Sequence, residues 1–275
     1  MRRILAIILL GILPGLAGAQ DSALESLQTA NDTRGWEAVG RIDIAGRAFC
    51  TGAMIAPDIV LTAAHCLFDS GRKTPFAAND FKFLAGWRNG RAVAYRGVKR
   101  VLAHPSYQYL GPDHIEGVAY DLALLELDQP IMIASIKPFA IGSDVKMGET
   151  VEVVSYAHDR AEAPSLQKSC SVLGPQPGMT VFSCSVDFGS SGAPIFRVMD
   201  GVPRIVSVVS AKAELAGQQV SLGVRMAQPL ADLRAAFDLS QDRFRKITPG
   251  ASALPQISAT AAVASKQPNA KFLRP

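Results

Sequence analysis

A long series of short apolar runs, each ended by turn-forming residues, restricts the fold of this chain more than any other feature. The runs are rich in β-branched residues and are bounded by Gly, Pro, Asn or Asp, which is typical of β-strands. They cover residues 38–44, 53–55, 59–62, 81–86, 92–95 and 122–127, and then 150–156, 169–173, 180–184, 193–198, 205–209 and 220–224. We therefore predict an all-β protein in two halves. The strand pattern alone fits barrels or a sandwich equally well.

Two segments depart from this pattern. Residues 128–138 are interrupted by prolines and are interpreted as a connector between the halves. After the second half, Leu230, Leu233 and Phe237 recur at helical spacing. This spacing predicts one amphipathic helix over residues 229–237.

The chain begins with a cationic start, the apolar run Ile4–Leu13 and the small residues Ala17-Gly18-Ala19. These features predict a secretory signal peptide over residues 1–19. The apolar run is short for a membrane span, so a retained anchor is the weaker alternative. No cysteine lies near Gln20, which leaves a lipoprotein anchor without support. We expect a secreted or periplasmic protein with no stable membrane insertion after signal removal.

The formal net charge of +4 misleads about the folded part. Six of the 28 basic residues lie in the signal or in the tail 246–275, and neither segment is acidic. Residues 20–245 therefore hold 22 basic against 24 acidic residues and carry about −2. This balance does not indicate a nucleic-acid partner. The tail is rich in Ala, Ser and Pro, and its composition predicts a disordered basic segment.

Four cysteines, Cys50, Cys66, Cys170 and Cys184, are present. An even number in an exported chain predicts two disulfides. Spacing alone leaves three pairings open. A zinc site is poorly supported because no Cys-x-x-Cys pair occurs.

Three segments carry chemistry: Thr62–Cys66 with a histidine, Asp121–Leu125 with a carboxylate, and Gly189–Pro194 with a serine between glycines. A serine hydroxyl is a weak nucleophile and needs an adjacent base, which in turn needs an orienting partner. In this order the segments resemble the chymotrypsin-like serine proteases, in particular the bacterial branch related to glutamyl endopeptidases.

The resemblance implies a fold of two six-stranded antiparallel β-barrels with a C-terminal helix. We expect a leader or flexible arm at 20–34, an N-terminal barrel at 35–135 and a C-terminal barrel with the helix at 136–245. It also favours disulfides Cys50–Cys66 and Cys170–Cys184, each closing a loop of about 15 residues worth on the order of 3 kcal/mol.

The resemblance assigns His65 as general base, Asp121 as its orienting carboxylate and Ser191 as nucleophile, with the Gly189 and Ser191 amides forming the oxyanion hole. It requires no metal or cofactor. Weaker rivals for these roles are His104, His114, His158, Asp113, Asp128 and Ser190.

By position, Ser185 is expected at the floor of the substrate pocket, with Ser210 and Lys212 on its wall and rim. A neutral hydroxyl at the floor argues against strict preference for Lys or Arg. Residues 205–210 contain no histidine, so the glutamate specificity of the related branch does not carry over. Lys212 at the rim favours acidic or polar side chains, and for the substrate as a whole we predict a medium-sized apolar or polar residue in this pocket.

The residue before the nucleophile is Ser190, where the animal digestive branch often has an Asp that pairs with a freed N-terminal amine. That activation switch is therefore expected to be absent, and processing near Arg34–Gly35 is left open. We predict an exported serine endopeptidase acting on protein or peptide substrates through an acyl-enzyme. The alternatives are a catalytically silent binding protein on the same fold and an esterase-like hydrolase. The sequence does not indicate an oligomeric state.

Overall fold

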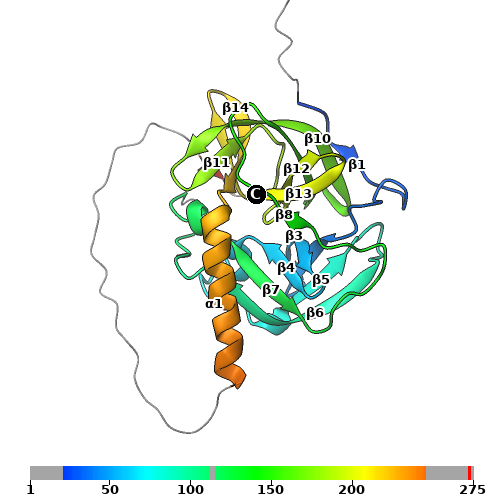
Figure 1. Ribbon diagram of the computed structural model, residues 1–275, viewed down its shortest axis with the longest axis vertical. Helices are drawn as coiled ribbons and strands as arrows, with labels where there is room; N and C mark the ends of the chain where they lie inside the picture. The colour runs from blue at the N-terminus through cyan, green and yellow to red at the C-terminus, as the bar shows by residue number, and fades with distance from the viewer. Residues whose placement is uncertain (1–20, 112–114, 246–271, 274–275) are drawn as a thin grey trace, which may run out of the picture.

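The computed structural model describes residues 21–111, 115–245 and 272–273. They form two β-barrels stacked one above the other, with one long helix beside them (Figure 1). The expected signal peptide and most of the tail 246–275 lie outside the described residues. Among the described residues, no helix combines the length and the apolar character needed to cross a membrane.

The first barrel closes in the strand order β2-β3-β4-β7-β6-β5. Its strands are β2 Val39–Ile44, β3 Ala48–Ala56, β4 Ile59–Thr62, β5 Phe81–Ala85, β6 Ala94–Ala103 and β7 Ala123–Leu127. Three short 3₁₀ helices interrupt them: η1 Ala64–Leu67, η2 Ala78–Asp80 and η3 Val118–Tyr120. The barrel interior is filled by fully buried side chains such as Ile42, Met54 and Phe83.

The second barrel is a ring of antiparallel strands in the order β10-β11-β14-β13-β12-β9, closed by pairing between β9 and β10. Its strands are β9 Thr150–Ala157, β10 Arg160–Gln176, β11 Met179–Phe182, β12 Pro194–Met199, β13 Val202–Leu215 and β14 Gln218–Val224. Three two-residue strands are added: β1 Glu25–Ser26 on β10, and β8 Ala140–Ile141 and β15 Phe272–Leu273 on β13. The predicted fold of two six-stranded barrels is thus confirmed, and the sandwich is excluded.

Helix α1 (Ala227–Arg245) follows the second barrel in sequence but packs on strands β6 and β7 of the first (Figure 1). Leu230, Leu233 and Phe237 are buried at this contact. The Arg100 guanidinium on β6 lies 3.4 Å from the centre of the Phe237 ring. The helix is longer than the predicted 229–237, because the apolar spacing marks only the part that is packed against the barrel.

The described part of the segment 20–34, predicted to be a leader or flexible arm, is docked on the second barrel. Strand β1 pairs with β10, and the Leu27 amide donates to the Pro164 carbonyl at 2.9 Å. Leu27 is also buried. The polar composition gave no sign of this contact, because backbone pairing to a neighbouring strand does not depend on side-chain type.

Candidate active site

Strand pairing in the first barrel brings a histidine and a carboxylate together. Strands β4 and β7 are antiparallel, with Thr62 opposite Ala123. The turn that follows β4 carries His65 on η1, and the turn that precedes β7 carries Asp121. The sequence places each residue just beyond a strand end, and the register makes these two ends neighbours.

Asp121 is fully buried and fixes the orientation of His65. One carboxylate oxygen accepts the His65 backbone amide at 2.8 Å, and the other lies 2.7 Å from Nδ1 of the imidazole. The Ser210 hydroxyl also donates to Asp121 in a very short hydrogen bond. A buried carboxylate is costly unless such donors surround it. They also hold Nδ1 toward Asp121, which leaves Nε2 for chemistry.

Ser191 lies in the long turn between β11 and β12, and contacts to the first barrel hold this turn. Its carbonyl accepts the Thr51 amide at 2.8 Å, and the Thr51 hydroxyl donates to the Gly189 carbonyl at 2.9 Å. Ser191 and His65 line the same cleft. Nε2 of His65 is buried and has no hydrogen-bond partner among the described residues.

The backbone conformation and close packing of the Ser191 turn require glycine at positions 189 and 192. Gly189 and Gly192 have φ of +96° and +79°, a region that side chains other than glycine rarely adopt. A Cβ on Gly192 would overlap the Thr62 hydroxyl and the Thr51 carbonyl, and one on Gly189 would overlap the Phe49 ring. The close approach of the Ser191 turn to β3 and β4 therefore depends on the missing side chains.

Ser190 is buried and holds the turn together. Its hydroxyl donates to the Tyr156 carbonyl at 3.1 Å and accepts the Asp187 amide at 3.3 Å. The Arg160 guanidinium donates to the same hydroxyl at 3.4 Å and to the Ser155 carbonyl at 2.9 Å. Burial lowers the pKa of the Arg160 guanidinium. This arginine ties the end of β9 to the Ser191 turn, and sequence reasoning missed it because the contact spans two distant segments.

The cleft has a volume of about 660 Å³ and its walls are largely apolar. Its aromatic lining comes from segments far apart in sequence: Phe49, Phe68, Phe76, Tyr109 and Phe188. Phe68 and Tyr109 stack with ring centres 5.0 Å apart. No local sequence pattern marks these residues as one surface, and they were not predicted as a site.

A family model described as Trypsin matches residues 28–214. The chain belongs to the trypsin family. The match includes His65, Asp121 and Ser191 and extends through most of β13.

Individual relatives of this trypsin-family chain match shorter stretches. It is 27% identical over 151 residues to the glutamyl endopeptidase of Bacillus licheniformis, covering 54% of this chain and 45% of the relative. It is 32% identical over 129 residues to a trypsin of Simulium vittatum, covering 45% and 47%. The modular serine protease of Drosophila melanogaster is 33% identical over 99 residues, covering 34% and 15%. The chain spans less than half of the length of each of these relatives.

A solved structure of a Glu endopeptidase in complex with MPD shares the fold, with a TM-score of 0.63 and 19% identity. The superposition covers 79% of this chain and 97% of the other. Nearly all of the solved structure therefore superposes on this chain.

The residues expected to form the substrate pocket do not line the cleft. Ser185 is exposed, and its amide donates to the Gln167 side chain at 2.8 Å. Ser210 is buried and its hydroxyl donates to Asp121, so its side chain belongs to the network around that carboxylate. Lys212 forms an ion pair with Asp187 at 2.7 Å and lies 4.5 Å from the Phe188 ring centre. Its charge is thus already matched, which removes the basis for expecting a preference for acidic side chains.

Of the rival histidines and aspartates, the structure describes His104, His158 and Asp128. His104 is buried, accepts the Ser106 amide at 3.0 Å and stacks on Tyr120. Burial lowers its pKa, which fits the structural role expected for it. His158 is exposed, as expected, but it also lines the cleft. Asp128 lies at the opposite end of β7 from Asp121. His114 and Asp113 lie outside the described residues.

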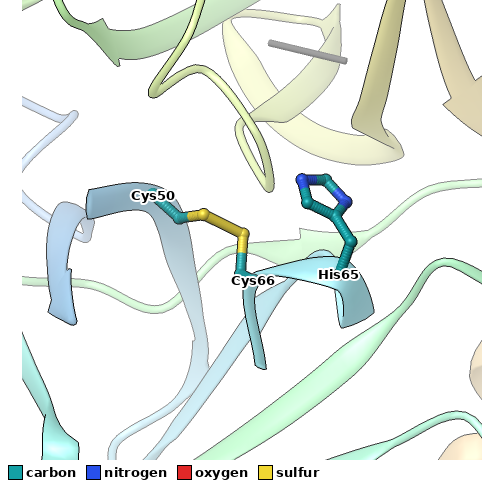
Figure 2. A group of neighbouring side chains, drawn as sticks. All are labelled: Cys50, His65 and Cys66. Atoms are coloured by element: carbon teal, nitrogen blue, oxygen red, sulfur yellow. A yellow bond between two sulfur atoms is a disulfide. The ribbon is translucent and has the colours of Figure 1, made fainter. Parts of the chain in front are cut away.

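Two disulfides are present, with the pairing that the family resemblance implied. Cys50–Cys66 and Cys170–Cys184 have S–S distances of 2.03 and 1.99 Å. Figure 2 shows the first disulfide beside His65, with Cys50 on β3 and the other two residues on η1.

The ligand atoms of Cys50, Cys66 and His65 lie within 4.8 Å of one another, which is close enough for a metal ion. Zinc binds cysteine as the thiolate, however, and both sulfurs are used in the disulfide. The group does not fit a zinc centre in the oxidised protein.

Proposed function

We propose that this trypsin-family chain is an exported serine endopeptidase that cleaves protein or peptide substrates through an acyl-enzyme. The observation that carries the proposal is the buried Asp121 carboxylate, which is bonded to Nδ1 of His65 while Ser191 lines the same cleft as that histidine. Family membership supports peptidase chemistry. Two disulfides support an oxidising compartment outside the cytoplasm.

In the proposed mechanism, the Ser191 hydroxyl attacks the scissile carbonyl and Nε2 of His65 takes its proton. Asp121 keeps the imidazole in the correct tautomer and stabilises its charged form. His65 then gives the proton to the leaving amine, and a water molecule repeats the sequence to release the acid. The amides of Gly189 and Ser191 donate to the oxyanion, and their orientation depends on the turn that Ser190 and Arg160 hold.

The substrate class follows from the cleft. Its aromatic lining favours an apolar substrate side chain next to the scissile bond. The neighbouring Lys212 and Asp187 charges are paired with each other. We therefore expect peptides with apolar residues to be cleaved faster than peptides with Lys or Arg at the corresponding positions.

The test is hydrolysis of a peptide library by the purified, disulfide-intact protein, compared with Ser191→Ala and with Ser70→Ala. Ser70 is a second serine of the same cleft and serves as the matched control. We expect Ser191→Ala to lose at least 10⁴-fold in rate and Ser70→Ala to keep wild-type activity. No hydrolysis by a folded wild-type protein would favour a binding protein, and hydrolysis of simple esters alone would favour an esterase.

A further inference from the structure

One edge of strand β13 becomes available next to the proposed catalytic residues. β12 pairs with β13 only as far as Val208, and the last backbone bonds on that side join Val209 to the residues that follow Ser191. The opposite edge of β13 stays paired with β14 as far as Leu215. From Ser210 onward, β13 therefore presents one edge that β12 no longer covers.

The chain's own C-terminal segment occupies this edge. Strand β15 pairs antiparallel with β13, with Phe272 opposite Ala213 and Leu273 opposite Lys212. Within the described residues, no other strand pairs with this part of the edge. The β15 chain runs from Ala213 toward Lys212, and so toward Ser210.

This position is close to the catalytic residues. Ser210 is two residues from Lys212, or about 7 Å along a strand, and its hydroxyl donates to Asp121. An exposed strand edge binds an extended peptide through main-chain hydrogen bonds, whatever the peptide's sequence. The edge of β13 is therefore the natural place for the backbone of a peptide that crosses Ser191, and β15 lies where such a peptide would pair.

The length and charge of the tail suit this contact. Residues 246–271 connect the end of α1 at Arg245 to β15, and 26 residues can span up to about 90 Å. The tail 246–275 is basic in sequence, and Glu214, which follows Ala213 on β13, is exposed beside this edge.

We propose that the C-terminal segment containing Phe272–Leu273 is a built-in competitor, which occupies the peptide-binding edge of β13 and must be displaced by substrate. The proposal rests on the proposed function, because it takes this edge as the substrate site. A tethered segment has an effective concentration on the order of 1 mM. A tail that binds its edge with a Kd of about 0.1 mM would therefore raise KM about tenfold and leave kcat unchanged.

The experiment compares the full chain with a chain that ends at Lys271 and with the double variant Phe272→Pro/Leu273→Pro. Proline lacks the N–H that strand pairing needs. Both changes should lower KM about tenfold for peptide substrates without changing kcat. The matched control is Ala264→Pro, which introduces a proline into the same tail away from β15 and should leave KM as in the full chain.

A second measurement does not depend on activity. A fluorescent peptide of residues 266–275 is titrated into the chain that ends at Lys271 and carries Ser191→Ala, with fluorescence anisotropy as the readout. We expect saturable binding, and none by a scrambled peptide. If the peptide binds but the protein with Ser191 intact hydrolyses nothing, the result would support the tail contact and contradict the proposed function. An active enzyme whose KM does not change on truncation, and whose truncated Ser191→Ala form does not bind the peptide, would overturn the competitor proposal. The proposed function would stand.

Discussion

The two barrels contribute to the site in different ways. The first supplies His65 and Asp121 from the ends of two paired strands, so the register of β4 and β7 is enough to bring them together. The second supplies Ser191 from an irregular turn whose shape depends on distant partners, including Thr51 and Arg160. The proposed base and its carboxylate are thus positioned by regular secondary structure, and the proposed nucleophile by long-range packing.

The largest expected effect is on kcat, and it tests the pair of His65 and Asp121 in the first barrel. Asp121→Asn replaces the carboxylate that orients His65, so the imidazole loses its required tautomer. We expect kcat to fall by about 10⁴-fold with little change in KM, measured on the best peptide substrate. Asp128→Asn, at the other end of the same strand, is the matched control and should keep full activity. Equal activity of the two variants would break the assignment of Asp121.

The next effect tests how closely the second-barrel turn is packed on the first. Gly192→Ala combines a positive φ with overlap of the Thr62 and Thr51 atoms, and should reduce the free energy of unfolding by about 3 kcal/mol or more. Gly201 has a similar φ of +74° but open space around it. Gly201→Ala should therefore cost only about 1–2 kcal/mol. Urea unfolding of both variants measures the difference, and equal costs would show that packing against the first barrel is unimportant.

A smaller effect tests whether the Ser191 turn depends on contacts within the second barrel, by removing the Arg160 guanidinium. Arg160→Met removes the guanidinium hydrogen bonds to the Ser155 carbonyl and the Ser190 hydroxyl, which costs about 1–3 kcal/mol. Because Ser190 lies in the turn that is proposed to form the oxyanion hole, we expect kcat to fall roughly tenfold or more while KM changes less.

Arg160→Lys should restore part of the lost kcat, since it keeps a donor and a charge. Arg197→Met is the control, because Arg197 pairs with Glu149 and Ser143 away from the cleft. It should alter stability but not kcat. If Arg197→Met lost as much kcat as Arg160→Met, the role of Arg160 would be general stabilisation of the fold and not positioning of the Ser191 turn.

The smallest effect is electrostatic. The hydrogen bond from Lys212 is the main cause that lowers the pKa of Asp187 below its usual value. A carboxyl with a lowered pKa in the folded state stabilises the protein above about pH 4 and loses this contribution as the pH falls. Since Asp187 is half exposed, Asp187→Asn should cost less than about 1 kcal/mol at pH 7. The difference from wild type should vanish near pH 2, as measured by urea unfolding at several pH values.

Local patterns predicted the strands, and the family resemblance of two short segments predicted the histidine–carboxylate pair. Short β-branched runs mark strands, and His65 and Asp121 stand at strand ends within recognisable segments. The sequence did not predict the apolar cleft or the contact of Arg160 with Ser190, because each joins segments distant in the chain. Nor did it indicate that the Ser210 hydroxyl donates to Asp121, since strand position does not say whether a hydroxyl faces a cleft or a buried carboxylate.

The most direct test of the central claim is labelling of the purified protein with a fluorophosphonate, which reacts with activated serines, followed by mass-spectrometric mapping of the adduct. We predict one adduct on Ser191, absent in Ser191→Ala and formed much more slowly in His65→Ala and Asp121→Asn. An adduct that forms at the same rate without His65 or Asp121, or that maps to another serine, would contradict the account.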